Sequence, residues 1–197
     1  MAAIACAVLA TVVLDVRAPG PGPLVQPLSA FALTSLAEWW MFVVEVAALG
    51  VALLAITVLR RGASWPLVAT LAVASGSLAV SGIFTTDPWF PWERALTPTG
   101  WVHVVAVLLT ALSLGAAMVQ RANALSLPWR LARDRWLERA FGGTLGAAIL
   151  YAATLMWRGQ PLHLFGFWER ALLAFALLWC ASVAYGPTAS EVPREYR

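Results

Sequence analysis

Long apolar stretches alternate along the whole chain with short segments rich in arginine, proline and glycine. Because an α-helix rises about 1.5 Å per residue, about 20 apolar residues cross the roughly 30 Å hydrocarbon core of a bilayer. The stretches predict an all-α fold, a polytopic bundle of six transmembrane helices that forms one domain over residues 1–197. The spans are expected at about residues 1–16, 39–59, 64–84, 100–119, 140–157 and 166–185.

The first apolar stretch, residues 1–16, is shorter than the others. It has neither the basic leader nor the small-residue cleavage pattern of a secretory signal. We therefore expect a retained helix. Its shortness would be accommodated by local thinning of the bilayer, by tilt of its neighbours, or by further residues upstream.

Composition supports the membrane assignment and argues against nucleic acid as a partner. Hydrophobic residues make up 61% of the chain and charged residues 12%, whereas soluble domains are about 25% charged. All 13 basic residues are arginine, which is typical of a bacterial genome rich in G and C. Because these arginines lie in short loops, they are expected to orient the helices rather than to bind nucleic acid.

The distribution of arginine between the loops predicts the orientation of the chain. Arg60 and Arg61 lie between spans two and three. The loop between spans four and five contains Arg121, Arg130, Arg133, Arg135 and Arg139. Since basic loops stay on the cytoplasmic side, both termini are predicted to be cytoplasmic, in a multi-pass protein of the bacterial inner membrane.

Residues 128–139 predict a short interfacial helix before span five. Trp129 and Trp136 stand seven residues apart and share one side of such a helix, while arginines occupy other positions. An amphipathic helix of this kind lies at the lipid headgroups. Contact with anionic lipid, or with a partner protein, is expected through Trp129, Arg130, Arg133 and Arg135.

Span five also has a smooth face of small residues. Gly142 and Gly146 form a GxxxG pair, which lets two membrane helices approach closely. Ser77 and Ser81 of span three have the same spacing and would offer a matching surface. Packing within one chain is favoured over a seam between two copies.

Ionisable residues inside the spans are the chemically informative positions, because an unpaired charge at the bilayer centre costs about 2.5 to 3.5 kcal/mol on insertion scales. These residues are Glu45, His103, Glu169 and Arg170. Counted from the predicted outer ends, Glu45 lies roughly 9 Å deep, Arg170 about 6 Å and His103 about 4 to 5 Å. We expect Glu45 to pair with Arg170 in one layer below the outer surface, beside His103.

Two further acids are expected to extend this cluster. Glu38 precedes Glu45 by seven residues and shares its helical face, and Asp87 lies just beyond span three. The favoured interpretation is a buried ion pair that holds three helices in register. The alternative is a functional site that binds a headgroup, relays protons or hydrolyses an ester.

No cofactor and no metal are predicted. His103 as an axial ligand of haem or chlorophyll is an open alternative, but the second histidine of a bis-histidine haem would have to be His163, in an outer loop. Cys6 and Cys180 lie in separate apolar runs without a CxxC spacing, so neither a metal site nor a disulfide is expected.

Four short motifs stand at span ends. They are Pro27-Leu28-Ser29, Gly82-Ile83-Phe84-Thr85-Thr86-Asp87-Pro88, Thr99-Gly100-Trp101-Val102-His103 and Gly166-Phe167-Trp168-Glu169-Arg170. Through these motifs, nearly the whole chain resembles the bacterial six-helix membrane family catalogued as domain of unknown function 998. The resemblance implies the architecture and no established reaction. It also implies that Ser29, Asp87, His103 and Arg170 are characteristic positions.

Two features depart from the family pattern. The opening helix is clipped, and the loop between residues 87 and 98 is unusually aromatic, with Trp89, Phe90 and Trp92. We expect this loop to contact the membrane surface or a partner protein.

A non-enzymatic role is favoured because no catalytic motif is complete: the sequence lacks a P-loop, an HExxH pair and a GxSxG elbow. The chain is expected to be an accessory or scaffolding subunit that binds membrane lipids or packs against other membrane subunits. One alternative is a membrane-embedded hydrolase or lipid-modifying enzyme that uses His103 near Ser29 or Asp87. Another is a proton-coupled carrier, although no proline interrupts the centre of a span.

Overall fold

The computed structural model describes residues 2–17, 28–31, 33, 35–59, 64–87, 96–124, 128–158 and 164–185. Within these ranges all regular secondary structure is helical, so the predicted all-α fold is confirmed for this part of the chain. The helices are α1 (Ala2–Arg17), α2 (Leu28–Phe31), α3 (Leu36–Leu59), α4 (Trp65–Ile83), α5 (Pro98–Ala124), α6 (Pro128–Trp157) and α7 (Phe165–Tyr185).

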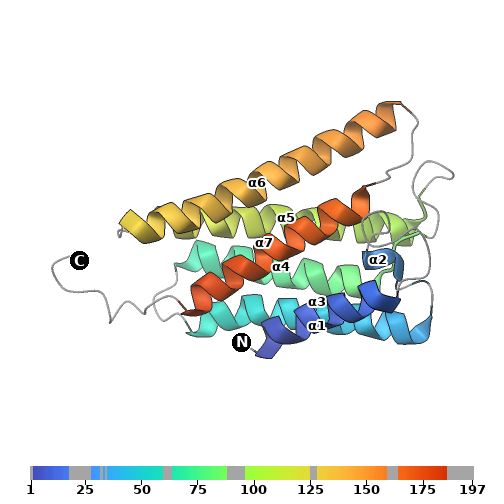
Figure 1. Cartoon of the computed structure of the whole chain (residues 1–197), viewed down its shortest axis with the longest axis horizontal. Helices are drawn as coiled ribbons and strands as arrows, with labels where there is room; N and C mark the ends of the chain where they lie inside the picture. The colour runs from blue at the N-terminus through green and yellow to red at the C-terminus, as the bar shows by residue number, and fades with distance from the viewer. Residues whose placement is uncertain are drawn as a thin grey trace.

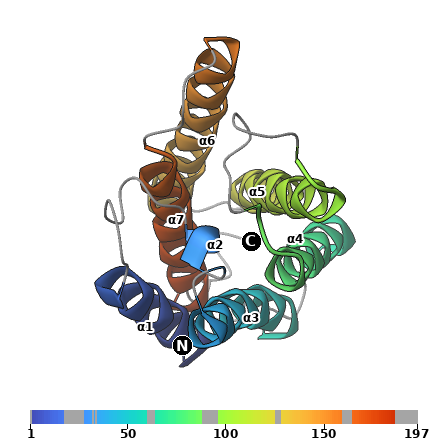
Figure 2. The same ribbon diagram turned by 90° about the vertical axis from the view of Figure 1, so that its right-hand side faces the viewer.

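The long helices lie side by side and alternate in direction (Figure 1). Each long helix packs on the next one along the chain, as short connections favour. α7 also contacts α1 and α3 and thereby closes the bundle. The short α2 lies over one end of the bundle (Figure 2). We call this the α2 end; the last turns of α1 and α4 and the first turns of α3, α5 and α7 lie there.

Five helices in the described residues are long and apolar enough to cross a membrane. The segments are Leu36–Ala55, Trp65–Ile83, Pro98–Asn123, Arg135–Trp157 and Phe165–Ala184. α1 has 16 residues and covers about 24 Å, which is less than the hydrocarbon core. The helices are those of a multi-pass membrane protein, but the predicted count of six spans is not confirmed.

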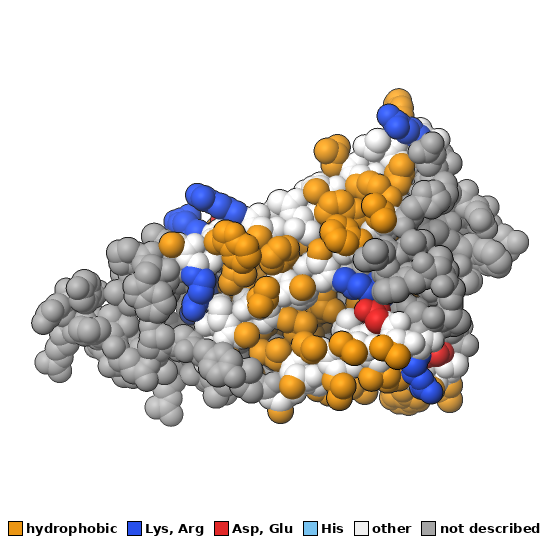
Figure 3. Space-filling model, in the orientation of Figure 1, with side chains coloured by type: hydrophobic (Ala, Val, Ile, Leu, Met, Phe, Trp, Pro, Cys, Tyr) orange, Lys and Arg blue, Asp and Glu red, His pale blue; other side chains and the backbone are white. Residues whose placement is uncertain are grey.

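The outer surface of the bundle is suited to lipid. Val105, Leu112 and Leu150 are each more than half exposed, at 56%, 57% and 69%. Figure 3 shows hydrophobic side chains over the middle of one face and basic side chains toward its ends. A continuous apolar surface of this kind would aggregate in water and is stable against hydrocarbon.

The predicted interfacial helix is not a separate element. Residues 128–157 form one continuous helix of 30 residues, α6. Pro128 stands in its first turn, where a missing N–H is tolerated. Leu137 and Phe141 are four residues apart, are both buried and lie on one face of the helix. The apolar stripe therefore continues through the point where a break was expected.

The main core lies toward the end of the bundle opposite α2. Its largest fully buried side chains include Trp179, Phe141, Leu53, Leu71 and Met118, which come from α3 to α7. A smaller cluster near the α2 end contains Leu14, Leu28, Phe42 and Val46. The bundle is thus packed both near the α2 end and toward the opposite end.

The second half of α6 leans away from the other helices (Figure 2). Only 6% of its apolar segment is buried, compared with 28% to 44% in the other candidate spans. A Cβ atom added at Gly142 or Gly146 would meet nothing within 4 Å. The predicted packing of this glycine face against another span is therefore not found among the described residues. The second half of α6 contacts α7 through Tyr151, which packs on Trp168.

Candidate functional site

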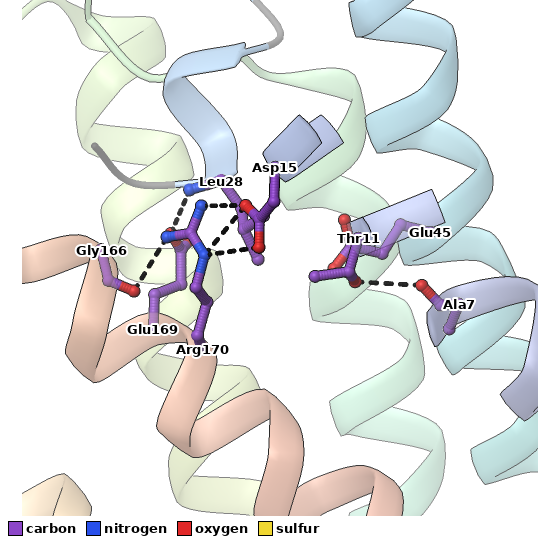
Figure 4. A network of polar contacts seen from close by, with 8 residues as sticks. All are labelled: Ala7, Thr11, Asp15, Leu28, Glu45, Gly166, Glu169 and Arg170. Atoms are coloured by element: carbon purple, nitrogen blue, oxygen red, sulfur yellow. Dashed lines mark hydrogen bonds and ion pairs between the residues drawn. The ribbon is translucent and has the colours of Figure 1, made fainter. Parts of the chain in front are cut away.

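Arg170 of α7 and Asp15 of α1 form an ion pair at the α2 end (Figure 4). The Nε atom of Arg170 donates to the two carboxylate oxygens of Asp15 at 3.0 and 3.1 Å, and one terminal nitrogen also donates to Asp15. The other terminal nitrogen donates to the carbonyl oxygen of Gly166 at 2.9 Å. The side chains are 15% and 25% exposed, so a mostly buried, charge-assisted contact joins α1 to α7.

The neighbouring residue, Glu169, accepts a hydrogen bond from the first backbone N–H group of α2. Its carboxylate accepts a hydrogen bond from the backbone N–H of Leu28, the first residue of α2. The first N–H groups of a helix have no partner within it, and a negative charge is favourable there. Successive helical residues point about 100° apart, so Glu169 turns toward α2 while Arg170 turns toward α1.

Glu45 lies in the interior, with 4% of its surface exposed. The hydroxyl oxygen of Thr11 is 2.9 Å from its Oε1 atom and 3.0 Å from the carbonyl oxygen of Ala7. The Oε2 atom of Glu45 is buried and has no hydrogen-bond partner in the described part of the chain. A buried carboxylate oxygen without a partner is costly, so Glu45 requires an explanation beyond packing.

The predicted direct pair between Glu45 and Arg170 is wrong. Arg170 bonds to Asp15 and Glu45 bonds to Thr11. Thr11 and Asp15 are four residues apart on one face of α1, so Glu45 lies about one helical turn deeper than the guanidinium. Asp15 was not among the residues predicted for this cluster, but it lies in the last turn of α1, which continues to Arg17.

A cavity of about 130 Å³ lies between the helices next to this cluster. Residues of every helix from α2 to α7 form its wall, which is largely apolar and includes Phe42, Leu49 and Leu173. Glu45 and Glu169 also line it. The cavity therefore joins an apolar interior to the acidic side of the polar cluster.

His103 joins α5 to the end of α4. Its Nδ1 atom lies 3.0 Å from the carbonyl oxygen of Ser81 and 2.8 Å from that of Phe84. Carbonyl oxygens only accept hydrogen bonds, so Nδ1 carries a proton and donates it. The last carbonyls of a helix lack partners within it, and His103 supplies one. Its hydrogen bonds within the described residues reach neither a carboxylate nor a serine hydroxyl.

Asp87 also links the end of α4 to the start of α5. Its carboxylate accepts hydrogen bonds from the backbone N–H of Thr97 at 2.8 Å and from the Thr97 hydroxyl at 2.6 Å. That hydroxyl accepts from the N–H of Gly100 at 3.1 Å, which makes Thr97 the N-cap of α5, with Pro98 in the first helical position. A Cβ atom at residue 100 would lie under 3.0 Å from the Asp87 carboxylate, so this position has room for glycine only.

The two remaining residues of the predicted cluster, Glu38 and Ser29, lie at the start of α3 and in α2. The hydroxyl of Ser35 accepts a hydrogen bond from the N–H of Glu38 at 3.2 Å and donates to the Glu38 carboxylate. This reciprocal contact resembles a capping box and begins α3. Ser29 lies in α2 and is buried, with 4% of its surface exposed.

Two of the arginines predicted to contact lipid or a partner form bonds within the chain. Arg133 donates to the carbonyl oxygen of Ser182 in α7 at 3.4 Å, and Arg135 donates to the side chain of Asn123 in α5 at 3.1 Å. These bonds fasten the start of α6 to its neighbours. Of the other predicted contact residues, Trp89, Phe90 and Trp92 lie outside the described residues, and the structure describes only the backbone of Trp129 and Arg130.

Three residues of the site were not predicted from the sequence: Thr11, Asp15 and Thr97. A signal for the first two exists, since a threonine and an acid four residues apart share one face of an apolar helix. Thr97 followed by Pro98 is a signal for a helix N-terminus. The partners of these residues follow only from the way the helices pack.

The four motifs at the span ends form two contacting pairs. The motif that ends α4 contacts the motif that begins α5 through the bond from His103 to the Phe84 carbonyl. The motif that contains Leu28 contacts the motif at the start of α7 through Glu169. The motifs therefore build two joints at the α2 end, one between α4 and α5 and one between α2 and α7.

A family described as "Protein of unknown function (DUF998)" matches residues 1–186. The chain belongs to this family, as the motifs predicted. Comparison with curated proteins and with solved structures found no match. The family relationship brings no activity with it.

We expect Gly100→Ala to lower the free energy of unfolding by about 1–3 kcal/mol, because the new Cβ atom would overlap the Asp87 carboxylate. In the Asp87→Ala background the same change should cost close to nothing. Gly76→Ala is the matched control, because a Cβ atom there meets nothing within 4 Å. Circular dichroism during a dodecyl sulfate titration measures these costs. An equal cost of Gly100→Ala in both backgrounds would contradict the contact.

Proposed function

We propose that this member of the family is a non-enzymatic membrane protein that binds one apolar or amphiphilic molecule, of the chemical class of membrane lipids, between its helices. The observation that supports the proposal is the cavity, about 130 Å³ in volume, with Glu45 and Glu169 in a largely apolar wall. Ligand sites in proteins are typically concave and apolar, with a few polar groups that fix orientation. This cavity has that composition.

The volume of the cavity limits the size of what it holds. An apolar cavity of roughly 150 Å³ stays dry and binds benzene, so 130 Å³ accommodates a group of about that size. A whole phospholipid is too large, whereas the end of an acyl chain or a small amphiphile fits. Phe42, Leu49, Leu114 and Leu173 would supply the apolar contacts.

The contacts of the candidate catalytic residues favour a non-enzymatic role. His103 donates to carbonyl oxygens at the end of α4, and Asp87 accepts from Thr97 at the start of α5. Each of these side chains thus stabilises a helix end. The hydrolase and the proton-coupled carrier stay predictions, because neither has a supporting contact in the described part of the chain.

A role as an accessory subunit also stays a prediction. Its supporting feature is the second half of α6, where Gly142 and Gly146 are exposed and a Cβ atom would meet nothing within 4 Å. Small residues let a helix of another membrane protein approach closely. Lipid is the other occupant that this face would accept.

We also propose that the chain crosses the bacterial inner membrane six times, with α1 as the first crossing. In support, α1 lies along α3, and Asp15 in its last turn meets Arg170 at the α2 end. Arg133 and Arg135 lie toward the opposite end, against the last turn of α7 and the end of α5. Since basic residues favour the cytoplasmic side, the α2 end faces outward and both termini face the cytoplasm.

Filling the cavity should abolish binding of a small apolar probe. Toluene at one hundred times its Kd stabilises a folded protein that binds it by about 2.7 kcal/mol, which raises the Tm. We expect this rise in the wild type and not in Ala176→Phe, because Ala176 lines the cavity and the new ring would occupy it.

Ala174→Phe is the matched control, since this position on the same helix is exposed. It should keep the full rise in Tm. Thermal unfolding of the purified protein in detergent, followed by circular dichroism, gives the three values. The same rise in Tm in Ala176→Phe and in Ala174→Phe would show that toluene acts through the micelle, and it would overturn the proposal.

Fusion reporters test the six crossings. Green fluorescent protein, which becomes fluorescent in the cytoplasm, should fluoresce when fused at either terminus. Alkaline phosphatase, which becomes active outside it, should be active when inserted after Arg94, between α4 and α5. Fluorescence at the C-terminus alone would mean an odd number of crossings, and an inactive phosphatase at Arg94 would reverse the orientation.

A further inference from the structure

With both carboxyl groups ionised, the polar side chains in the wall of the cavity offer acceptors and no donors. They belong to Glu45, Glu169, Ser81 and Thr110. None of the described lining residues is a lysine, arginine, histidine, asparagine, glutamine or tryptophan. A ligand in this cavity therefore meets oxygen lone pairs wherever it meets a polar side chain.

The two hydroxyl groups have already used their protons. Ser81 Oγ donates to the carbonyl oxygen of Leu78 at 2.7 Å, and Thr110 Oγ1 donates to that of Ala106 at 2.9 Å. A hydroxyl has one proton and two lone pairs. Ser81 and Thr110 can therefore only accept a hydrogen bond from a ligand.

Glu45 provides the acceptor with the greatest need for a partner. Its side chain is 4% exposed. The hydroxyl of Thr11 is hydrogen-bonded to its Oε1 atom at 2.9 Å, whereas its Oε2 atom has no hydrogen-bond partner among the described residues. An ionisable side chain inside a membrane bundle points to a function when no structural partner accounts for it. A ligand that donates to Oε2 would complete the coordination of this carboxylate.

The acids outnumber the bases in the polar cluster. Figure 4 shows three acids, Asp15, Glu45 and Glu169, and one guanidinium, that of Arg170, which lies against Asp15 and apart from Glu45. Arg170 donates to Asp15 and to its own helix, and Glu169 accepts the N–H of Leu28. The Oε2 atom of Glu45 is left without a hydrogen-bond partner in the described part of the chain. The electrostatic preference of the cavity is therefore for a cation.

We infer that the cavity binds a small apolar amine in its ammonium form, which donates hydrogen bonds to Glu45 and places its apolar body against Phe42 and the leucines. This inference rests on the proposed function and names the ligand class for the same cavity. A volume of about 130 Å³ suits an amine close to benzylamine in size. An anion would find no donor in the wall, and a hydrocarbon would leave Oε2 of Glu45 unsatisfied.

Probes of similar size and different charge test the inference on the full chain in phosphatidylcholine nanodiscs. Isothermal titration compares benzylamine, toluene and benzoate, with empty nanodiscs as the blank. We expect a Kd for benzylamine at least about tenfold below that for toluene, and no binding of benzoate. Toluene binding as tightly as benzylamine would overturn the inference and leave the proposed function standing. Failure of every probe to bind would overturn both.

Glu45→Gln tests the assigned partner. It should raise the Kd for benzylamine about tenfold and leave that for toluene unchanged, because it removes the charge and keeps the shape. Glu38→Gln is the matched control, since Glu38 lies on the same helix and bonds to Ser35. An unchanged benzylamine Kd in Glu45→Gln would overturn the role of Glu45. If that variant does not fold, the comparison of benzylamine with toluene on the wild type still tests the preference for an ammonium group.

A free amine and an aminophospholipid headgroup carry the same ammonium chemistry. Nanodiscs that contain phosphatidylethanolamine separate these sources. If the headgroup occupies the cavity, benzylamine binding weakens by competition. If the benzylamine Kd is unchanged, the cavity is selective for free amines. In both cases the preference for benzylamine over toluene in phosphatidylcholine must hold, and its loss would contradict the ammonium site.

Discussion

The ion pair between Asp15 and Arg170 is the contact on which the arrangement of the α2 end depends. An unpaired charge among apolar helices is unfavourable, so each side chain stabilises the other. The pair fixes the rotation of α7 against α1. With Arg170 turned toward α1, Glu169 faces α2 and the cavity; with Asp15 turned toward α7, Thr11 one turn earlier meets Glu45.

The other polar residues of this end satisfy helix termini, as hydrocarbon requires of every backbone group. His103 donates to the last carbonyls of α4, and Asp87 holds the N-cap residue of α5. Glu169 serves the start of α2. Once these roles are assigned, Glu45 is the acid of the cluster whose second oxygen has no partner in the described chain. Glu45 also lines the cavity, which is why the proposed ligand is placed there.

Much of the fold could be predicted from apolar periodicity, because a span of hydrocarbon requires a helix of known length. The gathering of Glu45, His103 and Arg170 near one end could also be predicted, since depth follows from residue counting. Their partners could not. Whether Arg170 meets Glu45 or Asp15 depends on helix rotation and on one turn of depth, and neither is encoded in the spacing along a single helix. The continuity of α6 was missed because an arginine-rich first half masks the buried stripe of Leu137 and Phe141.

A double-mutant cycle on the ion pair tests its central role most directly. The free energy of unfolding in a dodecyl sulfate titration would be measured for Asp15→Asn, Arg170→Gln and the double variant. If the two side chains hold α1 to α7, the double variant loses less stability than the sum of the single variants, by about 1 kcal/mol or more. Losses that add to within about 0.5 kcal/mol would show that the two residues act independently and would contradict the arrangement described for the α2 end.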